Sequence, residues 1–272
     1  MMFKALFTSF LLIFLCVDVF ACRFWCAVGE DTPKALVAKQ LIEDSDSLKE
    51  LGATYEDGWS VGYYADGKAV ITRSSGSSKE EDDFDKAVHA NSAHSANIQF
   101  SHLRRASSGC VEGVPNPHPF ERQFADKHWI FGHNGGMKKQ ILIDLIQEDF
   151  LSSNSPNTCT DNAPQSWIDS ELYFIFLLKH IEANDMQVEI GLTKALAALY
   201  QVIPNKKRKL NFFLSDGNSL WVFRKGNTLF YHEDNSTTIV ASSIPDPSTK
   251  DWSVFPEDKL ARLTPGEPIN FF

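Results

Sequence analysis

Apolar side chains recur at helical spacing in three stretches of the chain, residues 33–51, 167–181 and 189–202. Spacings of three and four residues place such side chains on one face of a helix. Pro33 suits a first helical turn, because proline lacks the N–H that a helix start leaves unbonded. The pattern therefore predicts a helix in each stretch.

Short apolar runs bounded by turn residues predict strands between the first two of these helices. Residues 59–64 and 68–72 flank Ala65-Asp66-Gly67, which is typical of a hairpin turn. The runs at 96–103 and 129–132 each lead into a polar turn that contains glycine. Polar groups in such turns are candidates for chemistry, since the buried strands position them.

After residue 210 the apolar runs become short and regular, with the turn pairs Asp216-Gly217, Lys225-Gly226 and Asp234-Asn235 between them. This spacing predicts a β-meander. Helices and strands come in blocks, and no internal repeat or linker divides the chain. We therefore expect an α+β fold in which helical layers are stacked on antiparallel sheets.

The segment at 74–85, SSGSSKEEDDFD, shows no apolar period. A polar run of this kind predicts a solvated loop whose acidic residues are a surface feature.

The start of the chain is similar to a secretory signal peptide. An apolar stretch at 5–17 is short for a membrane span, and residues 19–21, Val-Phe-Ala, suit a signal peptidase. We expect a signal peptide at 1–21, a mature domain at 22–272, and export to the periplasm or the medium without stable membrane insertion. Two alternatives stay open: an uncleaved N-terminal anchor, and a lipoprotein with lipid on Cys22, against which the bulky residue 20 argues.

Composition and charge narrow the class of protein. Of the 272 residues, 43% are hydrophobic and 22% are charged, which suits a globular core and excludes disordered, collagen-like and coiled-coil chains. The 26 basic and 35 acidic residues give a net charge of -9. A negative chain does not neutralise phosphates, so we expect no nucleic-acid partner.

Four cysteines remain after the predicted cleavage, Cys22, Cys26, Cys110 and Cys159. An exported protein can form disulfides, and a bridge between Cys110 and Cys159 suits their loop positions, although sequence alone does not determine the pairing. Cys26 also suits a small buried apolar position. No Cys/His cluster has the spacing of metal ligands, so we expect neither a metal nor a cofactor.

Cys22 is the strongest candidate for chemistry. As the first residue of a mature chain it would carry its own general base, because its α-amine has a reference pKa of about 7.7–8.0 and can accept the thiol proton. One residue would then supply both nucleophile and base, without a separate catalytic histidine.

Three further segments could complete a site for acyl transfer. The sequence His133-Asn134-Gly135-Gly136 offers an amide and a backbone N–H to an oxyanion, although it also suits a plain hairpin turn. Arg104 could hold a carboxylate through two hydrogen bonds, or be a surface arginine. Asp169 could bind an α-ammonium group, or be an acid at a helix start. Together, the two charges fit an α-amino acid.

Several motifs, in this order along the chain, resemble the class II glutamine amidotransferases, and in particular their stand-alone YafJ-like branch. The segments are CRFW at 22–25, DGW at 57–59, HLRRASSG at 102–109, NPHPF at 116–120, HNGG at 133–136, DSE at 169–171, VASSIP at 240–245 and WSVFPEDKLARLTPGEPI at 252–269. The likeness covers nearly the whole predicted mature chain.

The resemblance implies an N-terminal-nucleophile hydrolase fold, a four-layer αββα sandwich of two antiparallel sheets between helices. It implies that Cys22 attacks the side-chain amide of glutamine, and that Asn134 and Gly135 form the oxyanion hole. Arg104 would hold the substrate carboxylate and Asp169 its ammonium group. The remaining site residues that the resemblance implies support the pocket, namely His102, Ser107 and His118.

Two departures from the family pattern concern the pocket: Ser60 stands where the branch has glycine, and Ser243-Ile244-Pro245 lacks an acidic residue. The chain shows no ammonia-accepting segment, which favours hydrolysis of glutamine or another γ-glutamyl amide. Two other functions remain open, a non-enzymatic binding protein on the same fold with Cys22 blocked, and an acyltransferase that passes the γ-glutamyl group to an amine.

Overall fold

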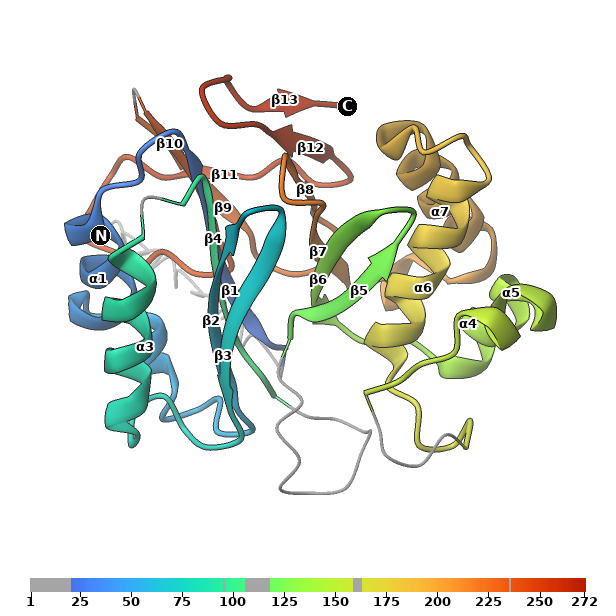
Figure 1. The fold of residues 1–272 in the computed structure, drawn as a ribbon, viewed down its shortest axis with the longest axis horizontal. Coiled ribbons are helices and arrows are strands. Elements are labelled where there is room, and N and C mark those ends of the chain that lie inside the picture. The colour runs from blue at the N-terminus through green and yellow to red at the C-terminus, as the bar shows by residue number, and fades with distance from the viewer. Residues whose placement is uncertain (1–20, 95, 106–117, 159–162, 235) are drawn as a thin grey trace, which may run out of the picture.

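The computed structural model describes residues 21–94, 96–105, 118–158, 163–234 and 236–272, and these form two antiparallel sheets between helices (Figure 1). The first sheet has seven strands in the order β11-β9-β10-β1-β4-β2-β3. In chain order they are β1 (Arg23–Gly29), β2 (Trp59–Ala65), β3 (Lys68–Ser74), β4 (Ile98–Leu103), β9 (Phe230–Glu233), β10 (Thr237–Ala241) and β11 (Ser253–Val254).

The second sheet has six strands in the order β13-β12-β8-β7-β6-β5. They are β5 (Phe120–Phe124), β6 (Lys127–Gly135), β7 (Leu210–Ser215), β8 (Leu220–Phe223), β12 (Leu260–Leu263) and β13 (Asn270–Phe271).

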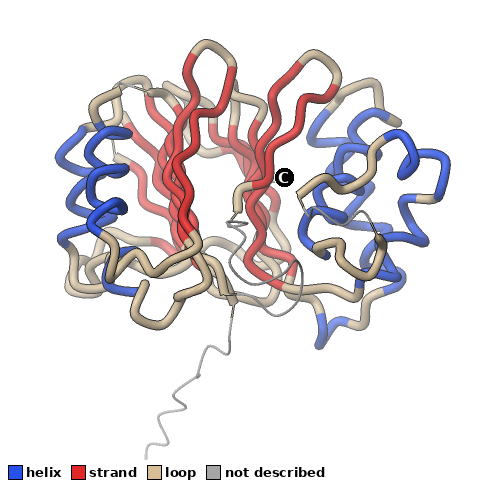
Figure 2. The backbone as a smooth tube through the Cα atoms, turned by 60° about the horizontal axis from the view of Figure 1, so that its bottom comes forward, coloured by secondary structure: helices blue, strands red, loops and turns tan. Residues whose placement is uncertain are grey.

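Helices cover the outer face of each sheet, so the molecule has four layers (Figure 2). The first sheet is covered by α1 (Lys34–Ala38), a π-helical turn at Lys39–Glu43, α2 (Leu48–Leu51) and α3 (Asp82–Ser92). The second is covered by α4 (Lys139–Ile146), α5 (Glu148–Ser153), α6 (Asp169–Glu182) and α7 (Val188–Val202), and a 3-10 turn lies at Asn205–Lys207. This confirms the α+β class and the αββα sandwich.

Three apolar clusters hold the layers together. The largest packs α6 and α7 against the second sheet, and another packs α1 and α3 against the first sheet around Trp25, Trp59 and Phe84. The third lies between the two sheets, where Phe24 and Phe100 contact Phe213. Burial of this much apolar surface is the main force that stacks the layers.

Most predicted elements are confirmed, but the helix predicted at 33–51 is broken. After α1 the chain makes a π-helical turn that the Asp44 N–H closes onto the Lys39 carbonyl at 2.9 Å. The backbone then extends, and Ser47 caps the short helix α2 by accepting from the Glu50 N–H. Polar residues at 43–47 interrupt the apolar period, because Ser and Asp offer the backbone other partners.

The prediction of a loop at 74–85 is wrong for residues 82–85, because α3 (Asp82–Ser92) begins there. Phe84 is fully buried, and Glu81 accepts from the Trp59 indole N–H at 2.7 Å. The acidic residues of the first turn stabilise α3, because the N-terminal end of a helix carries a partial positive charge. Phe84, Ala87 and Val88 supply its buried apolar face.

The meander predicted after residue 210 is also corrected. The β7–β8 hairpin belongs to the second sheet and the β9–β10 hairpin to the first, so the chain crosses between sheets after Phe223. Turn signals locate hairpins, but they do not say which sheet each hairpin joins.

Within the described residues, no helix combines the length and apolar character that a membrane crossing needs. The predicted signal peptide lies outside them, apart from Ala21.

Candidate active site

The alternation of side chains along β1 and β4 brings Cys22 and His102 into the space between the sheets. Phe24 on β1 and Phe100 on β4 both lie in the inter-sheet cluster. Successive side chains in a strand point to opposite faces, so residues two positions away share a face. β1 and β4 are antiparallel, and Phe24 pairs with His102. Cys22, two residues before Phe24, and His102, two residues after Phe100, therefore lie at the same end of the sheet.

The Cys22 thiol is buried beside the end of β4. Only 6% of the residue is exposed, and the backbone N–H of Arg105 lies 3.4 Å from its sulfur. The residue before it, Ala21, is also buried, and its carbonyl accepts from the Arg23 guanidinium at 2.9 Å. The start of β1 is therefore held firmly in the site.

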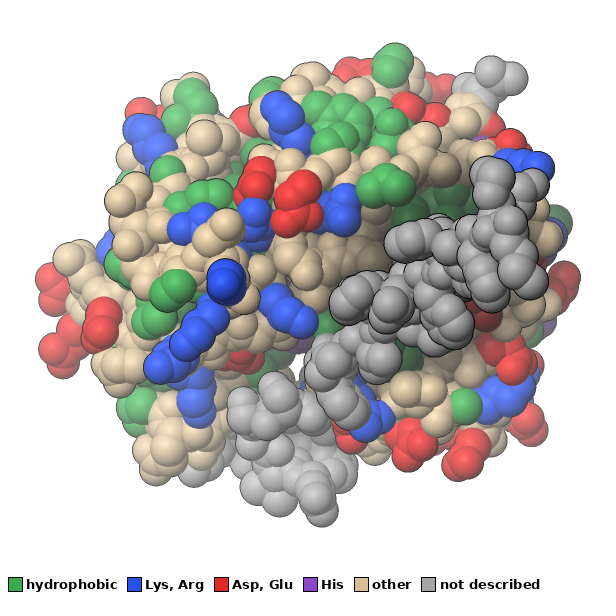
Figure 3. All heavy atoms as spheres, turned by 180° about the vertical axis from the view of Figure 1, so that it is seen from behind, with side chains coloured by type: hydrophobic (Ala, Val, Ile, Leu, Met, Phe, Trp, Pro, Cys, Tyr) green, Lys and Arg blue, Asp and Glu red, His purple; other side chains and the backbone are tan. Residues whose placement is uncertain are grey.

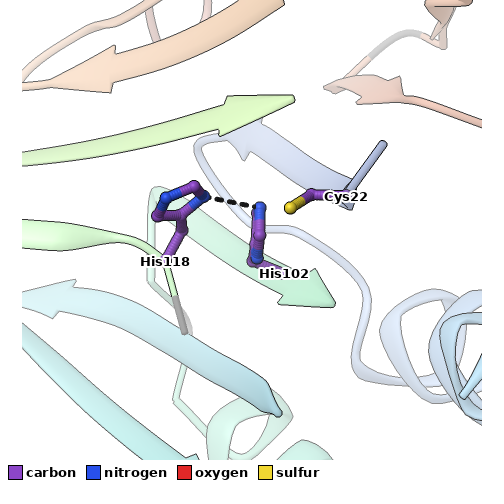
Figure 4. Close-up of side chains that lie close together, drawn as sticks. All are labelled: Cys22, His102 and His118. Carbon is purple, nitrogen blue, oxygen red and sulfur yellow. Dashed lines mark hydrogen bonds between the residues drawn. The ribbon is translucent and has the colours of Figure 1, made fainter. Parts of the chain in front are cut away.

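Two histidines share this space with the thiol. His118 Nδ1 lies 2.9 Å from His102 Nε2, and these two nitrogens and the Cys22 sulfur all lie within 4.8 Å of one another (Figure 4). The backbone N–H of His133 donates to His118 Nδ1, so this nitrogen is an acceptor and His102 Nε2 carries the proton between them. His102 Nε2 also faces the His133 carbonyl at 3.5 Å, which suits a donor.

Burial keeps both histidines neutral. Burial is the main cause that lowers the pKa of His102 to about 3 and that of His118 well below its usual range, and the nearby Arg104 charge contributes to both shifts. A neutral His102 that already carries a proton on Nε2 cannot accept a second proton there from Cys22. The arrangement therefore differs from that of a Cys–His pair, in which the histidine is the base.

Both predicted substrate-binding charges act on the thiol. Burial is the main cause that raises the pKa of Cys22, the Arg105 N–H and the Arg104 charge lower it, and the Asp169 carboxylate raises it. Both charges therefore act on Cys22 from different elements, Arg104 from the segment directly after β4 and Asp169 from the start of α6.

Asp169 is the first residue of α6 and is 9% exposed. Its Oδ2 accepts from the Met137 N–H at 2.7 Å and its Oδ1 from the Ser170 N–H at 2.9 Å. It is therefore an acid at a helix start that also fixes the chain after β6. Each carboxylate oxygen can accept more than one hydrogen bond, so capacity for an ammonium group remains.

His133, Asn134 and Gly135 lie within β6 and pair with β7, so the hairpin-turn alternative is wrong for them. Asn134 is fully buried, and its Nδ2 donates to Ser242 Oγ at 3.2 Å. Its Oδ1 accepts from Asn227 Nδ2 at 3.1 Å, which fixes the orientation of the amide.

Gly135 has no room for a side chain. A Cβ at this position would lie 1.9 Å from the carbonyl oxygen of Lys209, the residue before β7. The close approach of β7 therefore requires glycine at this end of β6.

Sequence reasoning missed Ser242, which links the two halves of the site. Its Oγ accepts from the Phe24 N–H at 3.1 Å and from Asn134 Nδ2, so it joins β1 to β6. The only signal was its place in the segment VASSIP at 240–245. Asn227 was missed as well, because nothing in its local sequence points to Asn134.

Ser60, a departure from the family pattern, has a defined role. Its hydroxyl donates to the His118 carbonyl, and its own carbonyl accepts from Ser101 Oγ at 2.8 Å. It helps to hold His118 in place. Ser107, Cys110 and Cys159 lie outside the described residues, while Cys22 and Cys26 are free thiols.

A cavity of about 470 Å³ adjoins the site at Asp169 and Gly136. Ile141 and Ile203 supply apolar walls, and Lys138 and Lys207 also line it. Lys and Arg side chains gather on the half of the molecule that carries α6 and α7 (Figure 3). A small anionic molecule would find favourable charge here.

Similarity to solved structures supports the fold. A glutamine aminotransferase class-II domain protein from Silicibacter pomeroyi matches over 92% of this chain and 98% of its own, with 17% identity and a TM-score of 0.57. Glutamine phosphoribosylpyrophosphate amidotransferase from B. subtilis matches over 92% of this chain and 49% of its own, with 11% identity and a TM-score of 0.60.

Sequence comparison gives two relatives. An uncharacterised protein of Methanocaldococcus jannaschii is 28% identical over 184 residues, 66% of this chain and 45% of its own. A protein of Haemophilus influenzae whose name places it among the glutamine amidotransferases is 27% identical over 173 residues, 60% of this chain and 51% of its own. The matches thus span about half the length of these relatives.

The family model of the class-II glutamine amidotransferases matches residues 45–235. This range holds Arg104, Asn134 and Asp169, and begins after Cys22. With most of the chain matched and the fold shared, the protein belongs to the class-II glutamine amidotransferases.

Proposed function

We propose that this protein hydrolyses the γ-glutamyl amide bond of glutamine or of another γ-glutamyl compound through a thioester on Cys22. The observation that carries the proposal is that the charges of Arg104 and Asp169 both act on the Cys22 thiol, while Ser242 joins Asn134 to Phe24, two residues after Cys22. A cation, an anion and an amide donor around one nucleophile match the carboxylate, ammonium and carbonyl of a glutamyl group.

We further propose that removal of residues 1–21 during export creates the general base. As long as Ala21 is attached, the Cys22 nitrogen belongs to a peptide bond and cannot accept a proton. Cleavage frees an α-amine whose reference pKa of about 7.7–8.0 suits proton transfer at neutral pH. This base is needed because burial raises the pKa of the thiol and His102 holds its own proton.

Acylation begins when the thiol proton passes to the α-amine and the sulfur attacks the γ-carbonyl carbon. The carbonyl oxygen becomes an oxyanion, which Asn134 Nδ2 and the Gly135 N–H stabilise. When the C–N bond breaks, the nitrogen takes the proton from the ammonium group of Cys22 and leaves as ammonia or an amine. A γ-glutamyl thioester remains on Cys22.

Deacylation follows the same path with water as the nucleophile. The α-amine takes a proton from water, hydroxide adds to the thioester carbon, and the C–S bond breaks. The proton returns to the sulfur and glutamate leaves. Arg104 and Asp169 hold the same ends of the glutamyl group in both steps, which keeps the reacting carbon beside the sulfur.

The first test is the intact mass and N-terminal sequence of protein recovered from the exported fraction. We expect a chain that begins with an unmodified Cys22. Retention of residues 1–21, or lipid on Cys22, would overturn the proposed activation and favour a binding protein.

The second test is ammonia release from glutamine by the chain that begins at Cys22. Cys22→Ala should abolish turnover and leave the cooperative unfolding transition intact. Cys26→Ala is the matched control and should retain activity, because Cys26 lies in the apolar inter-sheet cluster. Turnover by Cys22→Ala would exclude the thioester mechanism.

A further inference from the structure

We propose that Cys22, His102 and His118 form a binding site for a zinc ion, and that the ion blocks the nucleophile reversibly. The inhibitory part rests on the proposed function, whereas the binding part does not. The three side chains are separated along the chain, come from β1, β4 and the segment before β5, and meet in one buried place. Spacing along the sequence therefore predicted no metal site.

The distances suit zinc after a small adjustment. Zinc takes sulfur at about 2.3 Å and nitrogen at about 2.0–2.1 Å, which in a tetrahedron separates the ligand atoms by roughly 3.3–3.6 Å. The two imidazole nitrogens are 2.9 Å apart and would have to open by a few tenths of an ångström. The sulfur lies within 4.8 Å of both nitrogens, so it would close in by up to about 1.2–1.5 Å.

The donor set selects the class of metal. A thiolate with two imidazoles is soft enough for zinc and lacks the oxygen ligands that magnesium and calcium require. In a chain that begins at Cys22, the α-amine would supply a fourth ligand, because it closes a five-membered ring with the thiolate of the same residue. In a chain that retains Ala21, water would take that position.

The protons balance simply. Zinc replaces the thiol proton of Cys22, and one proton leaves to solvent. The ring proton of His102 moves from Nε2 to Nδ1, a buried atom that has no hydrogen-bond partner among the described residues. No hydrogen bond is lost at His102 Nδ1, and a metal bond replaces the His102–His118 hydrogen bond at Nε2. His118 Nδ1 would also give up the long hydrogen bond of 3.4 Å that it accepts from the His133 N–H.

Arg104 makes this site weaker than a structural zinc site. Its positive charge acts on Cys22, His102 and His118 alike, and would repel a divalent cation. The same residue is proposed to hold the substrate carboxylate. Loss of this charge should therefore weaken substrate binding and strengthen metal binding.

Cobalt(II) titration tests the site without any activity measurement, because a cobalt–thiolate bond gives a charge-transfer absorption. We expect one equivalent to produce this band in the wild type and none in Cys22→Ser. His102→Gln and His118→Gln should each weaken binding by roughly tenfold or more. Arg104→Gln should tighten it.

Two controls lie outside the cluster. Cys26→Ala removes the other described thiol, and His180→Gln removes a half-buried histidine of α6. Both should bind cobalt like the wild type. A band that persists in Cys22→Ser, or affinity unchanged in both histidine variants, would overturn the zinc site.

Inhibition is measured separately, on the chain that begins at Cys22. Zinc should compete with cobalt, stop ammonia release, and be reversed by a chelator. Undiminished turnover with the site filled would overturn the inhibitory role. An inactive metal-free enzyme that still gives the Cys22-dependent band would mean that the proposed function fails while the binding site stands.

Discussion

Cys22 directly precedes β1 and Cys26 lies within it, and their surroundings give the two thiols different chemistry. Cys26 is fully buried in the apolar cluster between the sheets, and burial alone raises its pKa well above the usual range. The Cys22 thiol is also buried, but the Arg105 N–H and the Arg104 charge partly offset that effect. Two repeats of the strand's two-residue alternation thus separate a packing residue from the proposed nucleophile.

The same contrast runs through the whole inter-sheet space. On β4, Phe100 belongs to the apolar cluster and His102 to the site, and on β6 Ile130 and Asn134 divide in the same way. In all three strands, apolar core residues therefore occupy the middle, and the polar residues of the candidate site lie at one end. A rigid apolar interior positions the polar groups, which keeps the cost of ordering them at binding low.

The sharpest test of this contrast is the order of alkylation by iodoacetamide. We expect Cys22 to react first and activity to fall to zero with that event, because the alkylated sulfur cannot attack. Cys26 should react only on unfolding. Peptide mapping separates the two, since trypsin cleaves after Arg23.

Equal labelling of Cys22 and Cys26 in the native protein would contradict the contrast. Residual activity of fully labelled protein would show that another group is the nucleophile.

The second largest effect is expected for Asn134→Ala. Loss of one oxyanion donor should lower kcat by roughly 100- to 1000-fold with little change in KM, because the interaction strengthens only as the oxyanion forms. Steady-state kinetics on glutamine measure this. Asn154→Ala, whose side chain bonds locally to Phe150, is the control and should leave kcat unchanged. A rise in KM alone would place Asn134 in substrate binding instead.

Arg104→Gln should have a smaller effect, of about 10- to 100-fold in kcat/KM, because a hydrogen bond to a charged group contributes about 1.5–3 kcal/mol. Most of the loss should appear in KM. The control is Arg105→Gln, because the Arg105 side chain bonds to the Thr54 carbonyl and only its backbone contacts the thiol. Equal losses in both variants would argue for a general effect of charge.

The smallest effect is expected for Ser242→Ala, which removes the hydroxyl that accepts from Asn134 Nδ2 and from the Phe24 N–H. Loss of the neutral hydrogen bond that positions Asn134, of about 1 kcal/mol, should lower kcat by roughly fivefold to tenfold. Ser242→Thr keeps the hydroxyl and should restore part of the rate if it folds alike. If Ser242→Ala changes KM but not kcat, the serine does not act through the oxyanion donor.

Much of the fold could be predicted from apolar periodicity. The helices expected at 167–181 and 189–202 correspond to α6 and α7 within two residues at each end, and the hairpin about Asp66 is present. The break in the helix at 33–51 and the start of α3 were not predictable in this way, because side-chain capping and acidic residues decide them.

The candidate site was predictable only in part. Residue types that carry chemistry stood out locally at Cys22, Arg104 and Asp169. Asn227 lies in the loop between β8 and β9 and Ser242 directly after β10, and both act through hydrogen bonds to Asn134, which is far away in sequence. The resemblance placed His102 and His118 around the pocket, but spacing along the chain could not predict that their ring nitrogens meet the Cys22 sulfur.

The buried position of Ala21 has a practical consequence for anyone who makes this protein. Any affinity tag or fusion partner joined ahead of Cys22 would have to leave through the space beside the thiol, where Ala21 already lies with its carbonyl bound by Arg23. Under the proposed mechanism such preparations lack the free α-amine of Cys22, so we expect them to release no ammonia from glutamine. The opposite end of the chain is suited to a tag, because Phe272 is 44% exposed and follows the edge strand β13.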